Sequence, residues 1–257
     1  MEIKTLFNDN RLKVALTLFL IWTLAVWHLP AGRQVSGFLY PIIAIATVTI
    51  VDLSITFVRD HKFYLPSASL VTGFLIGLII APTEKVWIIV AASLAASLSK
   101  QLIKAQVRQH IFNPAAFGII FVSLVFGVEV AWWGVGASKW IPVILIPLML
   151  RILWKMRRIS LPISFLAVYF LYFILVSKSA EAAFVSLLDG SVLLFALVML
   201  PEPITSPVKG QFKWLFGTLV AIFAIGLTQL GILNEVFLPA LLISNLVSFI
   251  LSKKLRQ

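Results

Sequence analysis

The sequence contains no cysteine and little charge. Of its 257 residues, 12% are charged and 61% are hydrophobic, and the mean hydropathy is +1.05. A soluble domain carries about 25% charged residues, so the composition excludes an ordinary soluble protein. Without cysteine the chain forms no disulfide, uses no thiolate nucleophile and ligates no iron–sulfur cluster. We interpret it as an all-α, polytopic membrane protein.

Acidic residues and histidines are also scarce. The sequence has ten Asp and Glu residues and 21 Lys and Arg residues, which gives a formal net charge of +11. His28, His61 and His110 lie far apart in sequence and match no metal-ligand spacing, so we expect no metal site. A basic chain can bind nucleic acid, but this one offers no soluble basic face, and we expect no nucleic-acid partner.

Long apolar stretches bounded by charge or by Pro and Gly dominate what is present. A helix crosses a bilayer with about 20 residues, and several of the stretches are shorter, notably 67–81 and 185–200, which we expect to be interrupted or re-entrant. We predict about ten transmembrane helices in a single membrane domain, 1–257: residues 12–29, 36–58, 67–81, 86–103, 114–131, 140–154, 161–178, 185–200, 213–230 and 236–251.

The distribution of Lys and Arg supports this count. With ten spans, 17 of the 21 basic residues fall on the side of both termini, and four fall on the other side: Arg33, Lys85, Lys139 and Lys178. Cytoplasmic loops carry the excess of Lys and Arg, so the pattern predicts a cell inner (plasma) membrane protein with cytoplasmic N- and C-termini. The first stretch has no small-x-small cleavage site before Arg33, and we expect it to remain as a helix rather than be cleaved as a signal peptide.

A similar pattern of Pro and small polar residues occurs twice along the chain. Pro41 corresponds to Pro162, Ser69 corresponds to Ser191, and the segment 110–115 corresponds to 235–240. Pro is common in the first turn of a helix, so coincidence is one explanation. The other is a repeat of five spans, about 12–131 and about 140–251, in which an odd number of spans inverts the second copy.

Two inverted five-helix repeats would place a ligand site near the membrane midplane, at the ends of interrupted helices. Unpaired N–H groups at helix N-termini attract anionic or electron-rich groups. Small polar residues also pack helices together, and that explanation stays open for each one. The candidate binding residues are Ser69, Thr72, Asn113, Pro114, Asp189, Ser191, Thr205 and Ser206.

Asp52 is an ionisable residue inside the second predicted span. A lone carboxylate in a membrane is costly, so its default interpretation is functional, with Lys100 as one candidate partner. Alternatively, Asp52 lies near enough to the cytoplasmic interface to be solvated. Asp52 and Lys100 complete the set of candidate binding residues.

Several motifs resemble the NqrB/RnfD family, the membrane flavin subunits of the sodium-pumping NADH:quinone oxidoreductase and of the Rnf complex. The similar segments are Ser67–Gly77, Ala81–Pro82, Lys100, Ile111–Gly118 and Glu202–Pro207, within a likeness that covers roughly residues 36–250. The resemblance implies ten helices in an inverted repeat related to urea and ammonium channels. It also implies flavin cofactors, one-electron transfer, and other Rnf- or Nqr-type subunits as partners beside the lipid bilayer and further copies of the chain.

The family attaches FMN to the Thr of a Ser-Gly-Ala-Thr motif in an outer loop. Here the corresponding loop reads Val135-Gly136-Ala137-Ser138, with Ser138 in place of the acceptor Thr. The match is degenerate. The alternative interpretation of this segment is a loop without a flavin, anchored at the membrane interface by Trp132, Trp133 and Trp140. We therefore expect riboflavin or FMN to be held without a covalent bond.

Two functions follow from different classes of protein. In the first, the chain is a flavin-binding electron-transport component, and any enzymatic role is that of a redox subunit shared with partners. In the second, the same midplane cavity is the path of a transporter or channel for flavin or another small solute. The short chain leaves little room for an extramembrane docking domain, which slightly favours an autonomous protein.

Overall fold

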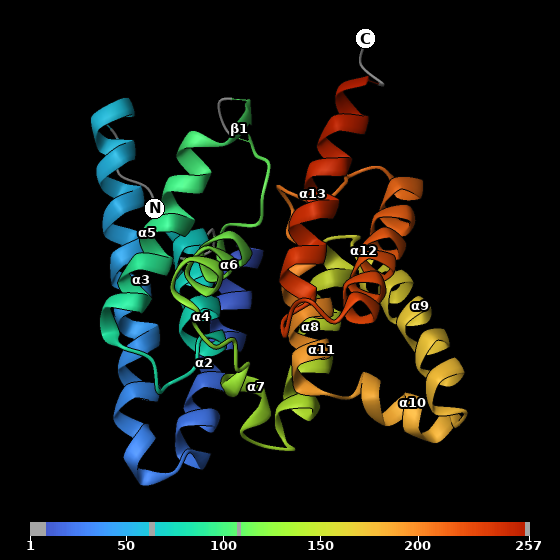
Figure 1. Ribbon diagram of the computed structural model, residues 1–257. Helices are drawn as coiled ribbons and strands as arrows, with labels where there is room; N and C mark the ends of the chain where they lie inside the picture. Colours follow the sequence, from blue (N-terminus) through green and yellow to red (C-terminus); the bar gives the residue numbers. More distant parts are fainter. Residues whose placement is uncertain (1–8, 62–64, 107–108, 255–257) are drawn as a thin grey trace.

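A computed structural model describes residues 9–61, 65–106 and 109–254 of the chain (Figure 1). These residues form helices joined by short connections, with one two-stranded hairpin, β1–β2, that follows α5 at one end of the bundle. The elements are α2 Asn10–His28, α3 Ala31–Asp60, α4 Ser67–Ile79, α5 Val86–Leu102, β1 Lys104–Gln106, β2 Gln109–His110, α6 Pro114–Phe126, α7 Trp133–Gly136, α8 Ile141–Lys155, α9 Ser160–Ser177, α10 Ala180–Leu187, α11 Gly190–Leu194, the π-helix η1 Phe195–Met199, α12 Gly210–Leu230 and α13 Phe237–Lys254.

Local sequence signals explain where several helices begin and end. The side chain of Asp9 accepts a hydrogen bond from the backbone N–H of Arg11 and so caps α2. Asn113 caps α6 in the same way, with Pro114 in its first turn, where the missing N–H costs nothing. Gly127 and Gly231 end α6 and α12 with positive φ angles of 66° and 63°, a conformation that glycine adopts without steric cost.

Each of the ten predicted apolar stretches coincides with a helix, but the prediction of ten full spans is not confirmed. Within the described residues, four helices are long and apolar enough to cross a membrane: α2, α3, α9 and α12. A fifth span arises if α10 and the α11–η1 segment are counted together. The helices α4, α5, α6 and α13 are shorter apolar elements. The chain is therefore a membrane protein, and the full span count stays a prediction.

The eighth predicted stretch, 185–200, is interrupted. The chain breaks between Leu187 and Gly190, and the two helical pieces are bent by 58°. Asp189 at the break caps α11 by accepting a hydrogen bond from the backbone N–H of Ser191. The helix then widens into the π-turns of η1, and every residue of η1 is buried. The predicted boundary was wrong at its start because α10 is a separate helix, begun by its own cap at Ser179.

The third and fifth stretches also end earlier than predicted. The helix α4 stops at Ile79 and α6 stops at Phe126, whereas the predictions ran to 81 and 131. The residues that follow are extended and pair with each other through a bridge between Ile80 and Val130. This pairing gives hydrogen-bond partners to backbone N–H and C=O groups that have none inside the two interrupted helices and that lie in an apolar surrounding.

The two halves of the chain lie side by side (Figure 1). The first half, α2 to α6, forms one group, and the second half, α8 to α13, forms the other. They meet where α2 contacts α8 and where α6 contacts α13. Most residues of the short elements α4 and α11–η1 are buried, so the interrupted segments are in the interior.

Glycine allows a close contact between α3 and α4 in the first half. A Cβ at Gly77 would lie 2.5 Å from the Cα of Pro41, and a Cβ at Gly73 would lie 2.5 Å from the Cα of Ile45. Both neighbours are backbone atoms of α3, which cannot move aside as a side chain can. The two glycines, one turn apart, therefore set the distance between α3 and α4.

We expect Gly77→Ala to lower the free energy of unfolding by about 1–3 kcal/mol, because the added methyl group overpacks a backbone contact. Gly226→Ala in α12 is the matched control, since no atom lies within 4 Å of its added Cβ. Thermal unfolding of the purified proteins in detergent measures both. Equal stability of the two variants would contradict the packing role of Gly77.

Candidate functional site: a cavity between the two halves

A cavity of about 110 Å³ lies between the two halves of the chain. Its walls come from α2, α4, α5, the start of α6, α8, η1 and the turn after η1. Most of the wall is aliphatic, and a few polar side chains converge on it. The polar residues are Asn10, Arg11, Thr72, Lys100, His110, Asn113 and Glu202.

A buried ion pair lies directly behind the wall of the cavity in the first half. The Nζ atom of Lys100 donates to Oδ2 of Asp52 at 2.7 Å, and the hydroxyl of Ser69 donates to the same oxygen at 2.7 Å. The side chain of Asp52 is only 4% exposed. The partner that the sequence suggested for Asp52 is therefore confirmed, and a solvated position at the interface is excluded.

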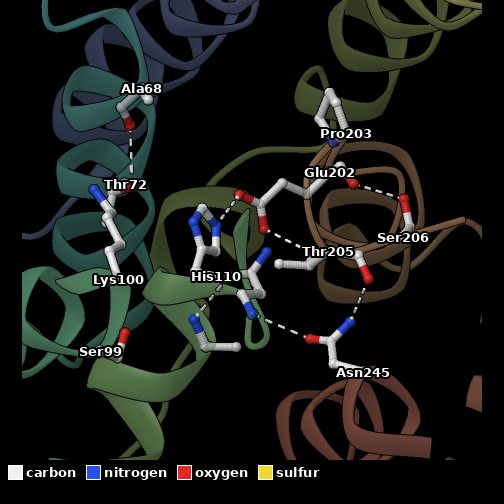
Figure 2. Close-up of polar contacts among 12 residues, drawn as sticks. Ala68, Thr72, Ser99, Lys100, His110, Glu202, Pro203, Thr205, Ser206 and Asn245 are labelled. Carbon is white, nitrogen blue, oxygen red and sulfur yellow. Dashed lines mark hydrogen bonds and ion pairs between the residues drawn. The ribbon is translucent and has the colours of Figure 1, made fainter. Parts of the chain in front are cut away.

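Two asparagines connect α6 to the second half. The side chain of Asn113 accepts from the N–H of Ala116 and donates to the carbonyl oxygen of Met199 at the end of η1. Its backbone N–H donates to Oδ1 of Asn245 in α13 at 3.1 Å, and Nδ2 of Asn245 donates to the carbonyl oxygen of Thr205 at 3.2 Å (Figure 2). The start of α6, the end of η1 and the following turn are thus held together in the interior.

Glu202 is the acidic residue of the cavity wall. Its Oε1 lies 3.2 Å from Nε2 of His110, and its Oε2 accepts from the hydroxyl of Thr205 at 2.9 Å. Figure 2 shows His110 between Lys100 and Thr72 on one side and the Glu202 turn on the other. Burial raises the pKa of Glu202, but the hydrogen bond and charge of His110, with help from Thr205 and Lys100, lower it further, so the net pKa lies below its usual value.

Arg158 supports the turn that carries Glu202. Its guanidinium donates to the hydroxyl of Ser206 at 2.6 Å and to the carbonyl oxygen of Pro203 at 3.1 Å. Ser206 in turn donates to the backbone carbonyl of Glu202 at 2.6 Å. Arg158 is buried, so these bonds replace the water that its charge would otherwise bind.

Eight of the ten predicted binding residues gather in or around this cavity. Thr72, Lys100, Asn113 and Pro114 line it. Asp52, Ser69, Thr205 and Ser206 lie one layer behind and hold the lining residues through the hydrogen bonds above. Polar residues at interrupted helix ends therefore indicate the region correctly, and whether they bind a ligand stays a prediction.

The structure does not bring the other predicted residues to the cavity. Asp189 and Ser191 bond to each other at the start of α11, where they cap the helix. Ser138 lies in the connection between α7 and α8, where its hydroxyl accepts from the backbone N–H of Trp140 at 3.4 Å. The helix α7 lies at the end of the bundle opposite the termini (Figure 1).

Sequence reasoning missed four lining residues: Asn10, Arg11, His110 and Glu202. Glu202 lies in a motif of the family resemblance and His110 directly precedes another, and these positions were the available signal. Asn10 and Arg11 precede the first apolar stretch and carried no signal. Among the described residues, the buried Oδ1 atom of Asn10 has no hydrogen-bond partner, and Asn10 lines the cavity.

The fold and the cavity define a class: a helical membrane protein with polar groups gathered between two halves. The model of the NQR2, RnfD, RnfE family matches residues 133–257, from α7 to the C-terminus. The second half of the chain is thus similar to this family, in agreement with the resemblance drawn from the motifs. No curated protein matches the chain. The matched half includes Glu202, Thr205, Ser206 and Asn245.

Breaking the buried ion pair should destabilise the protein. We expect Asp52→Asn to lower the free energy of unfolding by about 3–5 kcal/mol, because it leaves the ammonium of Lys100 buried without its counter-charge. The double variant Asp52→Asn with Lys100→Met should lose less than the sum of the two single variants, which a double-mutant cycle of thermal unfolding measures. Asp60→Asn, in the exposed Arg59–Asp60 pair, is the control, with an expected loss of about 0–1 kcal/mol. Strict additivity would contradict the pairing.

The lowered pKa of Glu202 predicts a pH-dependent stability. A carboxyl whose pKa is lower in the folded state stabilises the protein above its unfolded pKa, and this stabilisation is lost as the pH falls. Wild-type protein should therefore lose stability relative to Glu202→Gln as the pH falls below about 4.5, the ordinary value of the carboxyl. Unfolding curves at several pH values between about 6 and 3.5 test this. A difference in free energy of unfolding between the two proteins that stays constant over this pH range would exclude a titrating Glu202.

Proposed function

We propose that the chain is an integral-membrane electron-transport component of the NqrB/RnfD type that holds riboflavin or FMN without a covalent bond. The single observation that carries the proposal is the cavity, where residues from the unmatched first half meet Glu202 and its neighbours from the half that matches the family. In this family-type role the chain works with Rnf- or Nqr-type subunits, from the cell inner membrane, with both termini cytoplasmic.

The chemistry of the wall fits an isoalloxazine ring. Aliphatic residues of α4 and α8, among them Val71, Leu75 and Ile152, provide flat apolar contacts for an aromatic ring system. The unpartnered Oδ1 of Asn10 is an acceptor for the N–H of a flavin ring. Lys100 supplies positive charge on the opposite side, beside the carboxylate of Asp52.

When bound, a flavin would supply the one-electron chemistry, and this chain's residues would hold and tune it. Lys100 and His110 carry donors toward the cavity, and donors and charges near a flavin set how readily it accepts an electron. The aliphatic wall excludes water from the ring. The bond between the backbone N–H of Asn113 and Oδ1 of Asn245 would join the two halves beside the ring.

The size of the cavity sets a condition on this proposal. Pockets for drug-sized ligands measure about 300–1,000 Å³, whereas this cavity measures about 110 Å³. Flavin binding therefore requires the walls to separate.

The small volume favours a second candidate from another class, a transporter or channel for a small solute. The cavity lies at the junction of two halves with interrupted helices, the position where inverted-repeat transporters bind their substrates. This candidate needs no widening of the walls for a solute of a few atoms. It predicts a protein that binds no flavin.

A visible absorption spectrum of the detergent-purified protein, taken before and after acid precipitation, separates these functions. Under the proposal we expect a flavin spectrum whose chromophore moves to the supernatant, because no ester bond retains it. A reductive titration of the bound flavin should then show electron uptake. A colourless protein that stays colourless after riboflavin or FMN is added would exclude flavin binding and leave the transport function.

Substitutions locate the flavin. Val71→Phe should fill the cavity and lower flavin occupancy at least about tenfold, since the ring and the new side chain compete for one volume. Ser138→Ala is the control and should keep its full, extractable colour. Colour that stays in the precipitate of the wild type and disappears in Ser138→Ala would instead show a covalent flavin at Ser138.

A further inference from the structure

A short segment, residues 131–136, lies between the two halves on the side away from the cavity. It contains α7, which contacts α2 and α4 of the first half and α11 of the second half (Figure 1). The cavity is lined by residues between 68 and 75, at the start of α4. The segment instead contacts Gly77 and Leu78, at the end of the same helix. The cavity and the segment therefore occupy opposite ends of the space between the halves.

Two glycines allow the segment to fit closely against both halves. A Cβ at Gly134 would lie 2.6 Å from Cδ2 of Leu78 in α4, and a Cβ at Gly190 in α11 would lie 2.4 Å from the carbonyl oxygen of Val135. Carbon atoms do not approach other atoms this closely, so neither position has room for a side chain. The backbone of the segment is thus in direct contact with each half.

Two tryptophans hold the segment in this position. Nε1 of Trp133 donates to the carbonyl oxygen of Gly77 at 2.9 Å, and Nε1 of Trp132 donates to Oε2 of Glu235 at 2.7 Å. The other oxygen of this carboxylate, Oε1, accepts from two backbone N–H groups at the start of α13. One indole therefore bonds the segment to the first half, and the other indole bonds it to the second half.

The backbone at Trp132 is strained. Its φ angle is 47°, in the left-handed region that a bulky residue rarely adopts. Such a conformation costs free energy and persists only where surrounding contacts enforce it. Here the backbone N–H of Trp132 donates to the carbonyl oxygen of Ile79 at 3.1 Å, and its ring contacts Phe237, with 6.3 Å between the centroids. The strain favours release of the segment once these contacts are lost.

One turn of α4 separates the segment from the cavity. Leu75 lines the cavity, and Leu78 is the residue that Gly134 contacts. Three residues of an α-helix advance by about 4.5 Å. Both leucines are buried, so this turn forms a thin apolar layer between the cavity and the segment.

We propose that residues 131–136 form a plug that closes the space between the two halves, so that the cavity exchanges its contents only at the end where α5 and α8 end. Release of the plug requires the bonds of Trp132 and Trp133 to break, and it exposes Leu78 to the other side of the membrane. The proposal concerns the route of access. It therefore does not rest on flavin binding and applies equally to a flavin or to a small solute.

Single cysteines report this access, because the chain has no cysteine of its own. Val71→Cys places a thiol in the cavity wall, and Leu78→Cys places one directly beneath the plug. A membrane-impermeant, cationic methanethiosulfonate reagent is added to sealed right-side-out or inverted membrane vesicles, and mass spectrometry measures the remaining free thiol. Cysteines at two exposed lysines mark the sides: Lys209→Cys marks the cavity side and Lys139→Cys marks the plug side.

Val71→Cys should react from the cavity side only, and Leu78→Cys should react from neither side. With Trp132→Phe and Trp133→Phe added, Leu78→Cys should react at least about tenfold faster from the plug side, since each lost hydrogen bond shifts the opening equilibrium by about fivefold. Trp140→Phe is the matched control, because Trp140 is exposed and lies beyond the plug. It should leave the rate within about twofold.

Reaction of either cysteine from the plug side while both tryptophans are in place would overturn the proposal, as would an unreactive Val71→Cys on the cavity side. An unchanged rate of Leu78→Cys after the two tryptophan substitutions would also overturn it. An equal acceleration from both sides would show a general loosening of the fold and exclude a plug. If the doubly substituted protein does not fold, Trp132→Phe alone should raise the rate about fivefold, and a rate equal to that with Trp140→Phe would overturn the proposal.

Discussion

Helix ends inside an apolar medium must find hydrogen-bond partners within the protein, because no water reaches them. The structure meets this constraint with two asparagines. The side chain of Asn113 bonds to a backbone N–H at the start of α6 and to a backbone carbonyl at the end of η1. The side chain of Asn245 links the start of α6 to the turn after η1. The interrupted helices, the turn that carries Glu202 and the cavity beside it all depend on these four hydrogen bonds.

The same constraint explains how charges are distributed in the interior. Asp52 has Lys100 and Ser69, Glu202 has His110 and Thr205, and Arg158 has the hydroxyl of Ser206 and a backbone carbonyl. Each buried charge has a partner from a different segment of the chain. The cavity is thus bordered by polar groups whose positions are already fixed, the arrangement that a tuned cofactor site requires.

Much of the architecture could be predicted from composition and spacing. The apolar stretches predicted the positions of the helices because length and hydropathy are local properties of the sequence. Lys100 could be predicted as the ion-pair partner of Asp52 because a lone intramembrane carboxylate needs a cation. The pairing of His110 with Glu202 spans 92 positions and left no local trace. An interruption of the stretch 185–200 was predicted from its short length, but the polar residues around the break also suit a binding site. Asp189 and Ser191 proved to cap a helix there, a role that polar residues at helix starts share with ligand binding.

The π-helix η1 gives the second half an unusual sensitivity to chain length. A π-turn holds one residue more than an α-turn, so the segment Phe195–Met199 fits an extra residue into the helix without turning the chain that follows. Each residue of an α-helix turns the chain by about 100°. If the same residues formed a regular α-helix, the segment after Met199 would be rotated by that amount and Glu202 would face away from His110. The composition of this segment can vary among apolar residues, but its length is part of the site.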